Sequence, residues 1–294
     1  MIEKYEGWIL AKSTIHHGGN EKTGSTPVLR TIFLYVEGRG EIPFPYINGN
    51  SIRGKLRRLL MRDFFEKINF SPENLDTKVY HTFFTGGALE ATEGTYAIVD
   101  LPLRRKIRNL FIPLGLLGCA IGNQMIPGKL KVGHAFPICE EYSKFLPETF
   151  HDERIKMPVR IFTDETFNTR RDDLHAVREE DEQAVQMRID FECFIPGTKF
   201  YHWFLLEYPT SLERSCFGRF MEIFKEYPFL GGKSGIGNGE VILSYAPELP
   251  SSKEYLDFIE MKKDEIHELV AEISKDLNKP KKTKIQKKSK VEEK

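Results

Sequence analysis

The chain has 294 residues, of which 40% are hydrophobic and 12% aromatic, as is typical of a globular protein. No apolar run is long enough to cross a bilayer and the N-terminus lacks the apolar core of a signal peptide, so we expect a cytoplasmic protein without membrane contact. The four cysteines lie far apart without a C-x-x-C pair, which argues against a disulfide framework and a zinc site. No metal or cofactor is therefore expected.

The formal net charge of zero hides an uneven distribution. Residues 275–294 hold nine Lys and three acidic residues, which leaves 34 basic and 40 acidic side chains on residues 1–274. The body of the protein is therefore mildly acidic, and only local basic clusters could bind a polyanion. We expect residues 279–294 to form a disordered basic tail.

The N-terminal part of the chain predicts two strands followed by a basic helix. Residues 4–13 and 28–37 are rich in β-branched and aromatic residues, which favours strands. Residues 51–66 follow the spacing of a helix buried on one face, with apolar positions Ile52, Leu56, Leu59, Leu60 and Phe64. Five basic residues lie mostly off this face: Arg53, Lys55, Arg57, Arg58 and Arg62.

The start of this helix has two interpretations. Asn50 or Ser51 is the expected cap, because either side chain can accept from first-turn amides. The remaining free amides and the nearby cations would make a receptor for phosphate and would suggest a nucleic-acid ligand. A basic run is also common on a helix that simply faces solvent.

A His-Gly segment, Ile15-His16-His17-Gly18-Gly19, follows the first predicted strand. Adjacent histidines project in different directions and no third ligand is nearby in sequence, so a metal site is disfavoured. An acid/base pair is possible in principle because histidine titrates near neutrality. We favour a backbone turn, in which the glycines allow close approach to another segment.

The rest of the chain predicts further strands and helices in alternation. Residues 67–128 are irregular except for a helix near 104–118. Apolar alternation predicts strands over 130–138 and 185–195, and further strands are expected over 198–207, after the turn Pro196-Gly197, and over 240–245. Two capping boxes, Thr210 with Glu213 and Ser251 with Glu254, predict helices that start there. The second of these helices is expected to run to about Leu277.

This order of elements predicts an α+β fold. Its skeleton is strand, helix, two strands, helix, strand, which is the ferredoxin-like arrangement. Insertions interrupt it at 67–128 and at 140–184. The second insertion is highly polar, for example at Arg178-Glu179-Glu180-Asp181-Glu182, so it is expected to form the tip of a projecting hairpin.

A glycine-rich segment, residues 231–239, precedes the last predicted strand. It does not fit a Walker loop, because position 227 is Tyr, and it does not open a helix as a dinucleotide fingerprint does. A helix-to-strand turn requires fewer than its five glycines. An amide-rich loop with Lys233 and Ser234 could instead approach a phosphate backbone.

Other candidate contacts are less specific. Residues 104–108 form a further basic cluster, Arg-Arg-Lys-Ile-Arg. Five rings could stack on bases or belong to the core: Tyr46, Phe83, Phe84, Phe167 and His175.

Four segments together resemble the RAMP superfamily of CRISPR–Cas systems. Ile15–Gly19 resembles its strand-one motif, and Ile47-Asn48-Gly49-Asn50-Ser51-Ile52-Arg53-Gly54 resembles its Ile-Pro-Gly-Ser-Ser-Ile-Arg-Gly signature, with Asn48 in place of Pro. Residues 191–200, with Pro196-Gly197-Thr198, resemble the strand that closes the thumb, and residues 230–239 resemble the terminal glycine-rich loop. The likeness is greatest to the backbone subunit of multisubunit effector complexes, type IV first and type III next.

The resemblance implies a hand-shaped subunit. Its modified RNA-recognition-motif palm would comprise residues 1–66 and 129–250, with a finger insertion at 67–128 and a thumb β-hairpin at about 160–190. A C-terminal helix, 251–278, and the tail would complete the chain. Implied partners are CRISPR RNA, a complementary target nucleic acid, copies of the chain in a helical filament, and other effector subunits. The implied RNA contacts are His16, His17, Gly18, Gly19, Asn48, Gly49, Asn50, Ser51, Arg53, Lys55, Arg57, Lys233 and Ser234.

The resemblance also bears on catalysis. Type III backbone subunits cut target RNA with an aspartate after the first strand, but the first Asp here is Asp63, and Glu21 is the only acid between Ile15 and Arg30. We therefore predict no nuclease activity. Two alternatives stay open: target cleavage through Glu21 or a histidine, and an endoribonuclease that processes CRISPR transcripts with a histidine base.

Overall fold

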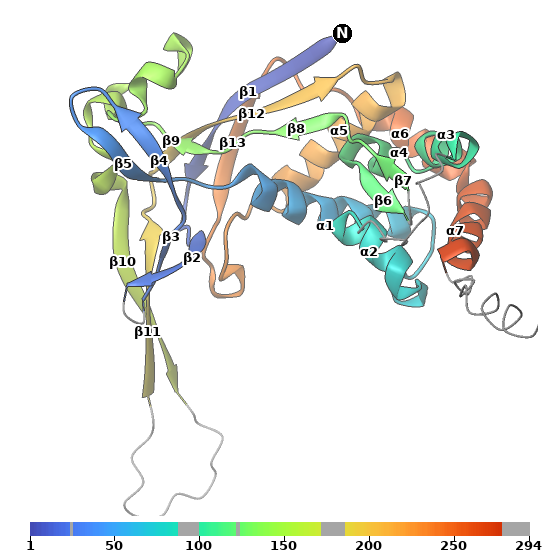
Figure 1. Cartoon of the computed structure of the whole chain (residues 1–294), viewed down its shortest axis with the longest axis horizontal. Helices are drawn as coiled ribbons and strands as arrows, with labels where there is room; N and C mark the ends of the chain where they lie inside the picture. Colours follow the sequence, from blue (N-terminus) through green and yellow to red (C-terminus); the bar gives the residue numbers. More distant parts are fainter. Residues whose placement is uncertain (24–25, 88–99, 122–123, 172–185, 278–294) are drawn as a thin grey trace, which may run out of the picture.

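A central antiparallel sheet organises the protein. The computed structural model describes residues 1–23, 26–87, 100–121, 124–171 and 186–277. The sheet has the strand order β13 (Val241–Ala246), β1 (Ile2–Ala11), β12 (Lys199–Glu207), β8 (Leu130–Val132), and β9 (Phe136–Pro137) also pairs with β12. The long β1–β12 ladder runs from Ile2 opposite Glu207 to Leu10 opposite Lys199. Figure 1 shows this sheet above the helices.

Helices cover one face of the sheet. They are α1 (Gly49–Lys67), α2 (Thr77–Thr85), α3 (Leu101–Leu110), α4 (Ile112–Leu117), α5 (Ser211–Glu226), α6 (Lys253–Met261) and α7 (Lys263–Leu277). Alternate β12 residues such as Phe204 point to this side, where Phe204 packs against Phe217 and Phe220 of α5. The other face of β12 carries Tyr201 and Trp203, which pack against Ile138, Leu146 and the 3-10 turns of the segment 143–162.

Four two-stranded hairpins project from this body. They are β2 (Gly18–Thr23) with β3 (Thr26–Leu29), β4 (Thr31–Val36) with β5 (Gly40–Pro45), β6 (Cys119–Ile121) with β7 (Gln124–Ile126), and β10 (Thr163–Arg171) with β11 (Gln186–Phe194). The β10–β11 hairpin extends far from the sheet, away from the helices (Figure 1). Its register pairs Thr163 with Phe194 and Arg171 with Gln186.

The mixed α+β class and most predicted elements agree with the structure. The Thr210–Glu213 capping box is present at the start of α5, with both reciprocal hydrogen bonds. The paired strands β10 and β11 lie where a hairpin at about 160–190 was expected. The predicted hairpin tip, the tail and His175 lie outside the described residues. In the described part of the chain, no helix is both long and apolar enough to span a membrane.

Four predicted elements are interrupted. The predicted strand 28–37 is two strands, because Arg30 leaves the ladder and its backbone pairs with His17 and Tyr46 instead. The helix near 104–118 divides at Phe111, just before Pro113. The strand 130–138 divides where Ala135 pairs with Ile47 of another segment. The last helix divides at Lys262, and its start at Ser252 has no side-chain cap, so the second capping box was wrong.

Candidate nucleic-acid interface

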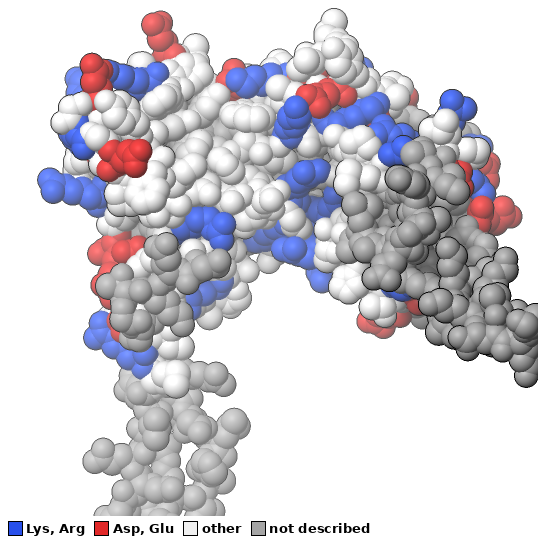
Figure 2. Space-filling view, in the orientation of Figure 1, with Lys and Arg blue, Asp and Glu red and all other residues white. Residues whose placement is uncertain are grey.

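The face between the β10–β11 hairpin and the helices is concave and carries basic side chains. Figure 2 shows Lys and Arg side chains gathered on this hollowed underside, while the acidic side chains in view lie mostly toward the periphery. Three of the sequence segments expected to bind RNA meet here: the His-Gly segment, the start of α1 and the glycine-rich loop. The contacts that join them define the candidate site.

The first amides of α1 are all used inside the protein. Asn48 is the cap, and its Oδ1 accepts from Asn50 N at 2.8 Å. Asn48 N donates to Nε2 of His17 at 3.1 Å, and Gly49 N donates to Nδ1 of His134 at 3.0 Å. The expectation that Asn50 or Ser51 caps the helix was wrong, and so was the expectation of free first-turn amides for phosphate.

These hydrogen bonds fix both histidines in neutral tautomers. His17 accepts at Nε2, so its proton is on Nδ1, whereas His134 accepts at Nδ1 and carries its proton on Nε2. Burial, with a smaller contribution from the charges of Arg30 and His16, lowers the pKa of His17 to about 4. Burial also lowers the pKa of His134. Both rings therefore act as acceptors for α1 at neutral pH.

Glycine is required at position 49 by close packing. A Cβ there would lie 2.4 Å from the carbonyl oxygen of Gly133. This contact brings α1 directly against the connection between β8 and β9, which holds His134 within reach of the helix start. Asn50 and Ser51 are exposed beside it, while Gly18 and Gly19 lie in β2.

His16 joins the His-Gly segment to two other segments. Its Nδ1 donates to the carbonyl oxygen of Glu192 at 2.7 Å, and its ring lies edge-on to Phe191 with centroids 5.1 Å apart. Its own carbonyl oxygen accepts from Gly232 N at 2.8 Å. These contacts support the interpretation of the segment as a backbone turn that approaches other segments. Among the described residues, no group of three or more His, Cys, Asp or Glu side chains is placed to hold a metal ion.

The glycine-rich loop presents Lys233 at the base of the projecting hairpin. Lys233 has a left-handed backbone with φ of 61°, and its Nζ lies 4.4 Å from the ring centroid of Phe191 in β11. Gly231 also has a positive φ, 73°, and a Cβ there would lie 2.4 Å from the carbonyl oxygen of His16. Ser234 begins a short 3-10 turn next to Lys233.

Two predicted RNA contacts on α1 are instead structural. Arg57 is buried and its guanidinium donates to the carbonyl oxygens of Leu117 at 2.8 Å and Gly118 at 2.7 Å, with a longer bond to Phe83. Arg53 also donates to Leu117 O. Burial lowers the pKa of Arg57 to about 10, with a smaller contribution from Arg53. Both arginines hold the end of α4 against α1, so the prediction that Arg57 reaches a phosphate was wrong.

Other α1 cations remain accessible. Lys55 is half-buried, with its Nζ 5.0 Å from the ring centroid of Tyr227 and 5.9 Å from that of Phe229, just before the glycine-rich loop. Arg58 and Arg62 are exposed and follow Lys55 at helical spacings of three and seven residues. Burial lowers the pKa of Lys55, with a smaller contribution from Arg58. Lys55 and Arg58 are therefore near neighbours.

The aromatic candidates separate into core and surface residues. Phe83, Phe84 and Tyr46 are buried and pack against other rings, so they are not available for base stacking. Phe167 on β10 is 51% exposed, with the guanidinium of Arg188 over its ring. The side chain of Glu21 lies outside the described residues. Sequence reasoning did not select His134 or Phe191 as site residues, although both lie in alternating strands and Phe191 begins the segment that resembles the closing strand of the thumb.

Comparison with known proteins identifies a fold. No protein-family profile and no curated protein matches the chain. Among solved structures, a chain of a "Type IV-B CRISPR Complex" matches with a TM-score of 0.60 and 20% sequence identity, over 84% of this chain and 92% of that chain. Nearly the whole fold is therefore shared with a protein whose sequence is very different.

The neutral state of His17 predicts a pH-dependent stability. Unfolding returns its pKa to about 6.5, so as pH falls below that value the unfolded state takes up a proton that the folded state, with a pKa of about 4, does not. The free energy of unfolding should therefore fall by about 2 kcal/mol by pH 5 because of this residue. Urea titrations at pH 7 and 5 should show a smaller fall for His17→Gln, whereas the exposed control His151→Gln should match wild type. Equal pH dependence in all three proteins would contradict this account.

Loss of the Arg57 guanidinium should strongly destabilise the fold. Arg57→Met leaves the carbonyl oxygens of Leu117 and Gly118 buried without this donor, at a cost of about 3 kcal/mol. Urea unfolding measures the change. The exposed neighbour Arg58→Met is the matched control and should change stability by less than about 0.5 kcal/mol. Equal stability of the two variants would mean that Arg57 is not a structural anchor.

Proposed function

We propose that the chain is a CRISPR RNA-binding backbone subunit of a multisubunit CRISPR effector complex. The observation that carries the proposal is the convergence of His16, the start of α1 and Lys233 at the base of a projecting hairpin. The basic, hollowed face beside them suits a polyanionic strand. The fold shared with a chain of a Type IV-B CRISPR complex supports the proposal.

The strand order supports a ferredoxin-like palm for this subunit. Taken in chain order, β1, β8, β12 and β13 are strands one to four of the skeleton, and their order in the sheet is four, one, three, two. In this interpretation β10–β11 is the thumb and the segment 67–128 supplies the finger region. Partners would be CRISPR RNA, a complementary target, other copies and other effector subunits in the cytoplasm.

The contacts shift the proposed RNA-binding role toward accessible side chains. The first amides of α1 already have acceptors, and Arg53 and Arg57 hold α4. Lys55, Arg58 and Lys233 therefore supply the proposed phosphate contacts. Phosphate contacts carry no base information, which suits a subunit that repeats along guides of different sequence.

We also propose that the subunit does not cleave RNA. His17, one of the two histidines that follow the first strand, is buried and already accepts from Asn48 N. Its pKa of about 4 makes it a weak base at neutral pH. A binding role uses the basic face without requiring a proton transfer.

Removal of single cations should weaken RNA binding regardless of sequence. Lys233→Ala and Arg58→Ala should each lower the slope of log affinity against log salt by about 0.7, the contribution of one phosphate contact on a single strand. Fluorescence anisotropy with two short unrelated RNA sequences, over a salt series, measures this slope. Lys253→Ala, an exposed lysine at the start of α6, is the matched control and should keep the wild-type slope. Unchanged slopes in the first two variants would contradict the proposed path.

The absence of cleavage is tested with repeat RNA and with a guide–target duplex, each with and without divalent metal. All RNAs should remain intact on denaturing gels. Metal-dependent target cutting at regular spacing would instead support a cleaving backbone subunit. Metal-independent repeat cleavage that is lost in His16→Ala would support a processing endoribonuclease.

A further inference from the structure

The ring of Tyr227 is exposed where α5 ends and the glycine-rich loop begins. It is 41% exposed, and its amide donates to Ile223 O in the last turn of α5. The ring of Phe229 packs against it, with centroids 5.0 Å apart and an interplanar angle of 45°. No described residue hydrogen-bonds the Tyr227 hydroxyl group. Tyr227 is therefore held in place while much of its ring stays accessible.

Lys55 of α1 lies over this ring. Its Nζ is 5.0 Å from the ring centroid of Tyr227, and it has no ion pair with another described residue. A lysine over an aromatic ring is held only weakly where water still reaches the cation. A phosphate group that attracts Lys55 therefore draws it from Tyr227 and uncovers a face of the ring.

The acidic neighbour of the ring is already neutralised. Glu226 precedes Tyr227, but its carboxylate accepts from Arg219 at 2.8 Å. Arg58 is exposed and follows Lys55 by three residues, about one turn of α1. The accessible ring therefore lies beside a pair of neighbouring cations. Proteins that bind single strands use this combination, with the ring for a base and the cations for the phosphates.

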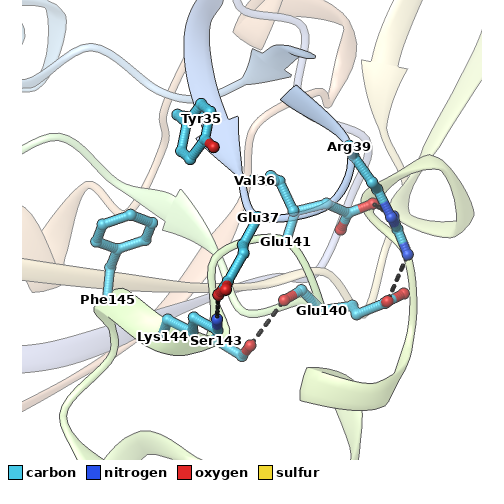
Figure 3. Close-up of a pocket in the computed structure, with 9 residues that line it drawn as sticks. All are labelled: Tyr35, Val36, Glu37, Arg39, Glu140, Glu141, Ser143, Lys144 and Phe145. Carbon is cyan, nitrogen blue, oxygen red and sulfur yellow. Dashed lines mark hydrogen bonds and ion pairs between the residues drawn. The ribbon is translucent and has the colours of Figure 1, made fainter. Parts of the chain in front are cut away.

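The exposed tyrosine on β4 has different surroundings. Tyr35 is 68% exposed and lines a hollow of about 650 Å³ together with Phe145 (Figure 3). Three carboxylates and two cations also line this hollow, in mutual ion pairs: Glu37, Glu140, Glu141, Arg39 and Lys144. A surface with more acidic than basic groups does not favour a polyanionic strand. Tyr35 is therefore an exposed tyrosine outside the proposed RNA path.

We propose that Tyr227 stacks on a base of the bound strand while Lys55 contacts the adjacent phosphate. On binding, Lys55 exchanges the ring for the phosphate, and the base takes its place on the ring. Aromatic stacking tolerates every base, so the contact suits guides of different sequence. The inference rests on the proposed RNA-binding function and adds a base contact at the end of α5, on a different element from the β10 strand that carries Phe167.

Removal of the bases from the ligand tests this contact. The probes are a short RNA of mixed sequence and a chain of the same length in which abasic sugars replace the nucleosides. Fluorescence anisotropy over a salt series measures the affinity of the full chain for each probe. The variants are Tyr227→Leu, Tyr227→Phe and Lys55→Ala, and Tyr35→Leu is the matched control. Far-UV circular dichroism checks that each variant folds.

Tyr227→Leu should bind the mixed-sequence RNA about tenfold more weakly than wild type, and the abasic chain within about twofold of wild type. Its slope of log affinity against log salt should not change, because stacking releases no counterions. Tyr227→Phe keeps the ring and should bind as wild type. Lys55→Ala should reduce the magnitude of the slope by about 0.7 on both probes. Tyr35→Leu should match wild type on both.

Three outcomes would overturn the base contact alone. They are wild-type affinity of Tyr227→Leu for the mixed-sequence RNA, an equal loss of its affinity for both probes, and a loss in Tyr227→Phe as large as in Tyr227→Leu. An unchanged slope in Lys55→Ala would overturn the exchange of Lys55 onto a phosphate. Wild-type protein that binds neither probe would overturn the proposed function, and this inference with it.

Discussion

The start of α1 is held by hydrogen bonds to two neutral histidines, and the candidate site depends on this arrangement. His17 follows β1 and His134 follows β8, yet both accept from consecutive amides of one helix. Backbone amides at a buried helix start must find acceptors, so these bonds fix the two connections and the helix relative to one another. The His-Gly segment then contacts the glycine-rich loop through His16 and Gly232. The result is a single rigid junction at the base of the β10–β11 hairpin.

The same junction determines what kind of anion contact is available. With the first amides of α1 occupied, positive potential on this face comes from side chains rather than from a helix terminus. Lys233 is oriented by the ring of Phe191, and Lys55 by the rings of Tyr227 and Phe229. Aromatic rings under a lysine limit its motion without neutralising its charge. Such cations suit a phosphate backbone of any sequence.

The sequence was informative where structure depends on neighbouring residues. The Thr210–Glu213 capping box and the apolar alternation over residues 185–195 are local patterns, and the structure has both, at the start of α5 and in β11. Breaks within elements were not predictable in this way. Arg30 leaves its strand to pair with His17 and Tyr46, and Ala135 pairs with Ile47. These partners lie far away in sequence or on other elements, so local periodicity contains no information about them.

The site shows the same limit. The sequence shows a basic helix, but it does not show which of its cations are buried and which are accessible. Arg57 and Lys55 look equivalent in the sequence. Arg57 is buried because carbonyl oxygens at the end of α4, 60 residues further along the chain, need its donors. His134 was visible only as one member of an alternating strand. Its role depends on the close contact of Gly49 with Gly133, which is a property of the assembled fold.

Electron cryomicroscopy of the protein expressed together with a CRISPR array tests the central proposal most directly. The proposal predicts helical particles in which RNA density follows the basic face and passes Lys233 and Lys55 at each copy. Particles without RNA, or RNA density on the face of the sheet that carries Tyr201 and Trp203, would contradict it.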